Sequence, residues 1–66
     1  MTPAQWRLSH RILEAVASDD LGLTDVMLAE RLGVTVTELR PLLGMLAGRG
    51  QIERCGDYLV PAGGAA

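Results

Sequence analysis

The sequence contains no lysine and no phenylalanine, and it has one residue each of cysteine, histidine, tryptophan and tyrosine. A single cysteine excludes an internal disulfide, and Cys55 with His10 supplies too few ligands for a tetrahedral zinc site. No carboxylates cluster on a common face, and no nucleophile is paired with a base. We therefore predict no enzymatic activity, no metal and no cofactor, and a free thiol at Cys55 that suits the reducing cytoplasm.

Long apolar segments and an excess of positive charge are also missing. No apolar run is long enough to span a bilayer, and no charged-then-apolar leader begins the chain, so we expect neither membrane insertion nor secretion. The net charge of −2 is opposite in sign to that of most nucleic-acid-binding domains. Residues 18–35 carry four carboxylates against one arginine, a net −3, whereas the charges of residues 36–60 cancel.

The 66 residues make one domain, near the lower size limit for folding without disulfides or metals. Apolar residues make up 48% of the chain, so aliphatic side chains must form the core with little aromatic help. We predict a domain over residues 1–61. The segment Ala62–Ala66 contains only alanine and glycine, and we expect it to form a flexible tail.

Residues 24–50 predict two short helices that meet at a tight turn, which is the helix-turn-helix arrangement. Thr24 precedes the first helix and suits its N-cap. Gly33 can adopt positive φ where that helix ends, because glycine has no Cβ. Ala29 is small enough to let the second helix cross nearby, and Leu39 fills the angle between the two.

The second of these helices has a core-facing stripe of four leucines, namely Leu39, Leu42, Leu43 and Leu46. Thr35 and Glu38 match a capping box at its start. Pro41 lies six positions past that cap and removes a hydrogen bond to the Thr37 carbonyl, so we expect the first turns to bend or loosen. Alternatively, the helix begins near Thr37, which puts Pro41 in the first turn at lower cost.

An N-terminal helix and a C-terminal hairpin complete the predicted elements. The segment Thr2–Gln5 matches a capping box, and the helix that follows runs to about Ala17. Its core stripe is expected to hold Leu8, Ile12, Leu13 and Val16, with Gln5 and Ser9 beside it. Residues 51–55 and 58–60 predict a hairpin with Gly56–Asp57 as its turn. Ile52 and Leu59 should point to the core, and Pro61 should end the second strand.

This order of elements resembles the winged helix-turn-helix family of bacterial regulators, from about Gln5 to Val60. Residues 28–54, LAERLGVTVTELRPLLGMLAGRGQIER, carry the resemblance most strongly. It implies a mainly α fold with a small β-hairpin, in the order helix, strand, helix, helix, strand, strand. In that fold, Leu21–Leu23 is a very short strand that pairs with the hairpin.

The resemblance also implies a transcriptional regulator that places helix 36–48 in the major groove of double-stranded DNA. The residues expected to contact DNA are Thr37, Arg40, Pro41, Gly44, Arg49 and Arg54. Arg40 can donate to both acceptors of a guanine, and Thr37 can contact a phosphate or a thymine methyl. Because each chain offers few positive charges, we expect a homodimer. Two alternatives stay open: Arg40 is only a solvated charge, or Arg54 pairs with Glu53 or Asp57.

A protein-interaction module is the competing hypothesis, because the same fold serves different functions. The expected contact residues are Trp6 and a smooth patch at Gly44 and Met45. Against this, Trp6 can fold back on the hairpin or tail and enlarge the core, and His10 is expected to be an ordinary surface residue. Gly44 and Gly48 suggest either close packing or a binding surface, because each weakens a helix.

The layout also resembles the small winged-helix proteins of bacterial ferrous-iron transport. Those proteins typically carry several cysteines in an extended wing. This chain has only Cys55 and a short wing. We therefore expect no iron–sulfur cluster.

Overall fold

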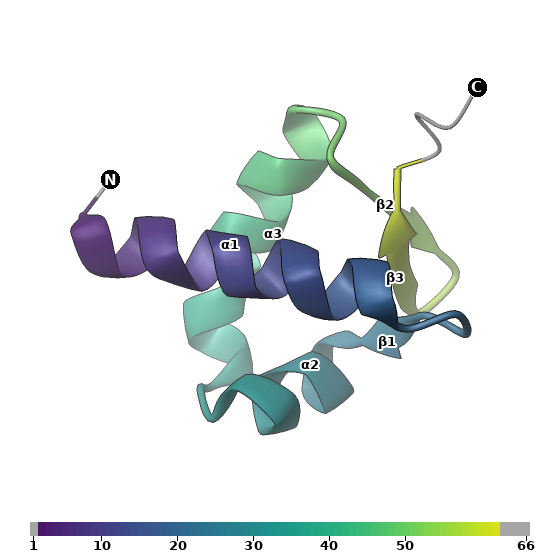
Figure 1. The fold of residues 1–66 in the computed structure, drawn as a ribbon, viewed down its shortest axis with the longest axis horizontal. Helices are drawn as coiled ribbons and strands as arrows, with labels where there is room; N and C mark the ends of the chain where they lie inside the picture. The colour runs from purple at the N-terminus through teal and green to yellow at the C-terminus, as the bar shows by residue number, and fades with distance from the viewer. Residues whose placement is uncertain (1, 63–66) are drawn as a thin grey trace.

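The computed structural model describes residues 2–62, which form three helices and a three-stranded antiparallel sheet (Figure 1). The elements are α1 (Pro3–Ser18), β1 (Leu23–Thr24), α2 (Asp25–Leu32), α3 (Val36–Gly48), β2 (Ile52–Cys55) and β3 (Tyr58–Pro61). This order confirms the predicted fold class, a mainly α chain with a small hairpin. Of the predicted tail, Ala62 donates its N–H to the Gln51 carbonyl oxygen at 3.2 Å. Residues 63–66 lie outside the described part of the chain.

A threonine caps each helix at the predicted position. In α1 the capping box is complete, because Thr2 Oγ1 accepts from the Gln5 N–H and Gln5 Oε1 accepts from the Thr2 N–H. Thr24 caps α2 by accepting from the Met27 N–H at 3.2 Å. Thr35 caps α3 by accepting from the Glu38 N–H at 3.1 Å. These bonds satisfy N–H groups that have no partner within the helix.

The third helix begins at Val36, so the alternative start near Thr37 is wrong. Pro41 lies inside α3, and the helix continues past it to Gly48. Proline has no N–H to give the carbonyl of Thr37, so that carbonyl lacks its usual helical partner. The four leucines predicted to face the core from α3 are all buried.

The corner between α2 and α3 has the predicted helix-turn-helix geometry. Gly33 adopts the left-handed conformation with φ 71°, and the Val34 N–H donates to the Ala29 carbonyl at 3.0 Å. This pattern closes the end of α2 and redirects the chain into α3. Ala29 is only 5% exposed and Leu39 is fully buried, so both occupy the interior positions predicted for them.

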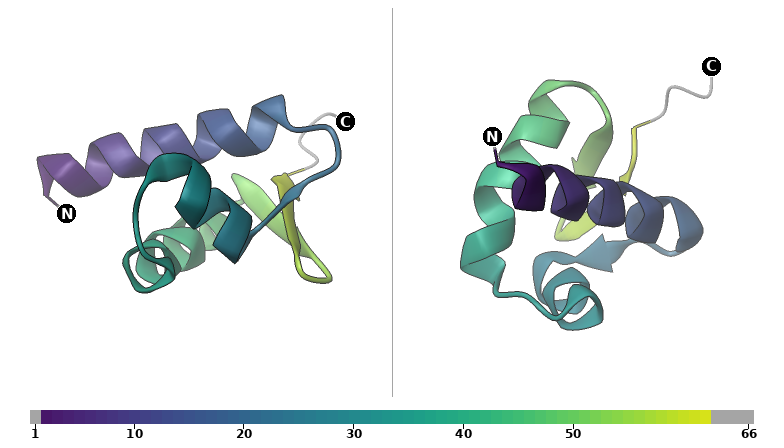
Figure 2. Two further views of the ribbon diagram at one scale, coloured as in Figure 1. Left: turned by 90° about the horizontal axis from the view of Figure 1, so that it is seen from below. Right: turned by 60° about the vertical axis from the view of Figure 1, so that its left-hand side comes forward.

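The first helix lies across α2, α3 and the hairpin (Figure 2). Its buried line differs from the predicted stripe. Ser9, Ile12, Ala15 and Val16 are buried, whereas Leu8 and Leu13 are only partly buried. Ser9 tolerates burial because its Oγ donates to the Trp6 carbonyl at 2.7 Å. The small side chains of Ser9 and Ala15 occupy core-facing positions that the sequence pattern assigned to leucine.

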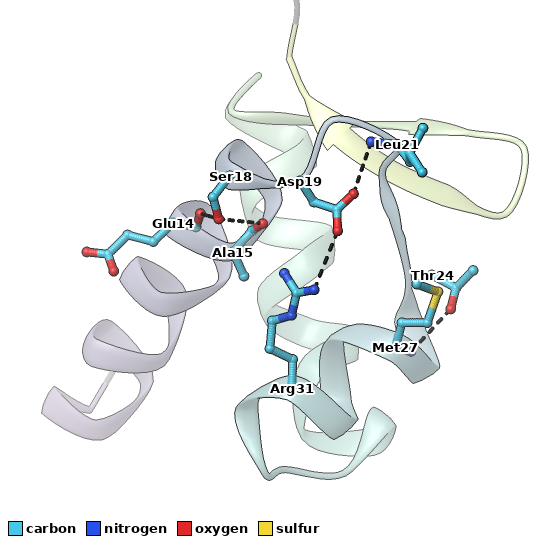
Figure 3. A network of polar contacts seen from close by, with 8 residues as sticks. All are labelled: Glu14, Ala15, Ser18, Asp19, Leu21, Thr24, Met27 and Arg31. Carbon is cyan, nitrogen blue, oxygen red and sulfur yellow. Dashed lines mark hydrogen bonds and ion pairs between the residues drawn. The ribbon is translucent and has the colours of Figure 1, made fainter.

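The sheet has the strand order β1-β3-β2. The Cα partners Leu23↔Leu59 and Arg54↔Leu59 place β3 between the two other strands. Leu23, Ile52 and Leu59 are buried, as predicted for the last two. The short strand predicted at Leu21–Leu23 is present but shifted to Leu23–Thr24. The shift follows from a turn in which Asp19 Oδ1 accepts from the Leu21 N–H at 3.0 Å (Figure 3).

Candidate nucleic-acid interface

The outer side of α3 carries an exposed stripe of four residues, Thr37, Arg40, Pro41 and Gly44. Their spacing of three and four residues puts them on one helix face. The opposite face is held in the core by the four buried leucines. The fold therefore gathers the predicted contact residues of α3 on one surface, which we call the α3 stripe. Met45, predicted for a partner patch, is instead partly buried and packs against the core.

The six arginines differ in the ion pairs and hydrogen bonds that their side chains form. Arg31 pairs with Asp19 at 3.5 Å, and Arg54 pairs with Asp25 at 3.2 Å. Arg11 Nη2 donates to the Leu32 carbonyl at 3.4 Å, at the C-terminal end of α2. Within residues 2–62, no ion pair or side-chain hydrogen bond holds the three others, Arg7, Arg40 and Arg49. The guanidinium of Arg40 is therefore free on the α3 stripe.

Arg54 forms its ion pair with a residue that the sequence analysis did not propose as its partner. Its partner is Asp25 in the first turn of α2, in place of the predicted Glu53 or Asp57. The two side chains are 52% and 25% exposed, and an ion pair this open contributes about 0–1 kcal/mol. Asp57 shares a shallow pocket with both of them. Arg54 can thus leave Asp25 for a phosphate at small cost, but two carboxylates oppose the phosphate.

The glycines of α3 are not required for packing. A Cβ atom placed on Gly44 or Gly48 would meet no other group within 4 Å. The suggestion that they let elements of this chain pack closely is therefore wrong. Both are exposed, and because glycine has no side chain, the backbone of α3 is directly accessible at these two positions.

Trp6 is 51% exposed, which contradicts the hypothesis that it enlarges the core. Its ring contacts His10 one turn later, with ring centroids 5.6 Å apart and planes at 49°. A separate groove of about 260 Å³ lies between α1 and α3 and is lined by Ala4, Gln5, Leu8, Glu38, Pro41 and Leu42. The sequence could not show this groove, because its walls come from helices far apart in the chain.

Within residues 2–62, no three His, Cys, Asp or Glu side chains come together in a way that could hold a metal ion. Cys55 is a free, exposed cysteine. None of the described helices combines the length and the apolar character needed to cross a membrane.

The open space at Gly44 gives a stability prediction. Gly44→Ala should raise the free energy of unfolding by about 1 kcal/mol, because alanine has the higher helix propensity and its methyl meets nothing. Chemical denaturation measures the change. The matched control is Ala47→Gly, at another exposed position of α3, which should lower stability by a similar amount. A Gly44→Ala variant less stable than the parent would contradict the open geometry.

Comparison of the chain with protein-family models, curated proteins and solved structures finds no match.

Proposed function

We propose that the chain binds double-stranded DNA by placing α3 in the major groove, as a small transcriptional regulator of the bacterial cytoplasm. The observation that supports this is the α3 stripe, where Arg40 is exposed and free of ion pairs within residues 2–62. Helices enter the major groove because its width matches theirs, and their exposed side chains then meet the base edges.

Three residues of the α3 stripe, Thr37, Arg40 and Gly44, have roles that follow from their chemistry. Arg40 donates two hydrogen bonds to N7 and O6 of a guanine. Thr37, one turn earlier, donates its hydroxyl to a phosphate or packs its methyl on a thymine methyl. Gly44 and Pro41 bring no side-chain donor. Gly44 has no side chain to separate the helix from the DNA, so the backbone of α3 can approach the floor of the groove there.

Two arginines outside the α3 stripe contact the DNA backbone in this proposal. Arg49 directly follows α3 and is exposed, and Arg54 lies on β2 of the hairpin. Phosphate contacts hold the protein in register without specifying sequence. So few contacts give weak binding, and we therefore include a homodimer that presents two α3 helices to neighbouring major grooves.

Replacing Arg40 tests the proposal most simply. Arg40→Ala should weaken binding to a mixed duplex by about tenfold or more, because a bidentate contact to guanine contributes about 1–3 kcal/mol. Fluorescence anisotropy across salt concentrations measures the loss. The matched control is Arg7→Ala, which removes from α1 another exposed arginine that has no ion pair within residues 2–62, and it should change affinity less than twofold. Equal effects of the two variants, or no binding by the parent at low salt, would refute DNA contact by α3.

The Arg54–Asp25 pair gives a prediction of opposite sign. Asp25→Asn should strengthen DNA binding several-fold, because it frees Arg54 and removes a carboxylate that repels phosphate. The dependence of log K on log salt should steepen by about one, in line with one added phosphate contact. Asp19→Asn frees Arg31 in the same way and serves as the control, with no gain expected. Unchanged or weaker binding by Asp25→Asn would exclude Arg54 from the interface.

A protein-interaction module is the second candidate, and the half-exposed Trp6 is the observation that favours it. Large exposed aromatic side chains often anchor protein interfaces. Trp6 is the only tryptophan, so its emission reports on this face directly. Binding of a protein partner here should shift that emission to shorter wavelength and be weakened by Trp6→Ala. Emission that stays constant while a partner binds would exclude this face.

A further inference from the structure

Four of the five large apolar side chains that are exposed among residues 2–62 lie around β1. They are Leu21, Val26, Met27 and Tyr58, with exposures of 88%, 57%, 45% and 46%. Trp6, the fifth, is on α1. We call the group around β1 the β1 patch. It shares no residue with the α3 stripe.

The four members of the β1 patch lie at the ends of β1 or beside it. Leu21 precedes β1, and Val26 and Met27 follow it in the first turn of α2. Tyr58 on β3 is the Cα partner of Thr24, so it stands beside β1 across the sheet. Figure 3 shows Leu21 and Met27 near the two ends of the β1 segment, with Thr24 beside Met27.

The core does not need these four side chains. In the core, α2 contributes the buried residues Leu28 and Ala29, and β1 contributes the buried Leu23. Val26 and Met27 lie on the outward side of α2, where polar side chains are the rule. Contiguous exposed apolar side chains with a polar rim mark interaction sites in monomeric proteins.

The rim of the β1 patch is acidic. Asp20 adjoins Leu21, Glu30 shares a shallow pocket with Met27, and Asp57 shares another with Val26. With Asp19 and Asp25, five carboxylates surround the patch against two arginines, a net −3. Both arginines, Arg31 and Arg54, are already held in ion pairs. The rest of the chain carries three carboxylates and four arginines, a net +1, so the negative charge is concentrated here.

From this combination we infer that the β1 patch is a docking site for a partner protein that presents an amphipathic, basic helix. Apolar residues of that helix cover Leu21, Val26, Met27 and Tyr58, while its lysines or arginines meet Asp20, Glu30 and Asp57. A second copy of this chain fits poorly, because a two-fold contact would bring two acidic rims together. Apart from Arg54 at its edge, this face repels DNA phosphates for the same electrostatic reason. The inference does not rest on DNA binding by α3.

Peptide titration of the ¹⁵N-labelled chain tests the inference. The probe is a helical peptide with leucines on one face and lysines on the other, and its charge-reversed version has glutamate in place of lysine. The lysine peptide should shift the amide signals of residues 21–31 and 57–58 and should bind at least tenfold more tightly than the glutamate peptide. Replacing Val26 and Met27 together by serine should weaken the lysine peptide at least tenfold. Trp6→Ser, which removes an exposed apolar side chain elsewhere, should leave its affinity within twofold.

Several results would overturn the inference. They are equal affinity for the two peptides, shifts centred on α1 or α3, no shifts at all, and full affinity in the serine variant. If the serine variant loses its helical circular dichroism, Glu30→Gln with Asp57→Asn takes its place and must weaken the lysine peptide. Dimerisation that the serine variant abolishes would identify a second copy as the occupant and contradict a basic partner.

Discussion

Burial of the α2–α3 corner is the constraint on which the rest of this structure depends. Gly33 turns the chain in the left-handed conformation, and Ala29 and Leu39 fill the space between the two helices. Once Leu39 and the three leucines after it on α3 face the core, the helical period forces Thr37, Arg40 and Gly44 to face solvent. The same packing that holds so small a domain together therefore also creates its exposed helix surface.

That surface is open and nearly neutral, and this determines what it can do. In the proposed DNA complex, Arg40 on the α3 stripe orients the protein but contributes little affinity, because affinity for DNA comes mostly from neutralised phosphates. Arg54 on β2 is held by Asp25. The strongest charge on the molecule is negative and surrounds the β1 patch. We therefore propose different partners for the two surfaces, a DNA groove for α3 and a basic protein segment for the β1 patch.

Local chemistry made much of the fold predictable. Threonine caps, the leucine period and Gly33 act over three or four residues, so their effects can be read from the chain. Most of the misses depend on tertiary geometry. Ser9 lies in the core although serine is polar, Arg54 pairs with a residue 29 positions away, and Trp6 stays exposed. The periodicity of α3 correctly predicts that Thr37, Arg40, Pro41 and Gly44 share one exposed face. Helix periodicity does not determine whether that face binds DNA, because binding depends on the charge of the surface and on the partner.

Mapping a DNA titration onto the amide signals of the ¹⁵N-labelled chain tests the role of α3 most directly. If α3 occupies the major groove, a mixed duplex at low salt shifts the signals of Thr37, Arg40 and Gly44, followed by those of Arg49 and Arg54. The signals of Leu21 and Met27 then stay in place, because their acidic surroundings repel phosphate. Shifts centred on residues 21–27 or on α1, or no shifts at low salt, would contradict DNA binding through α3.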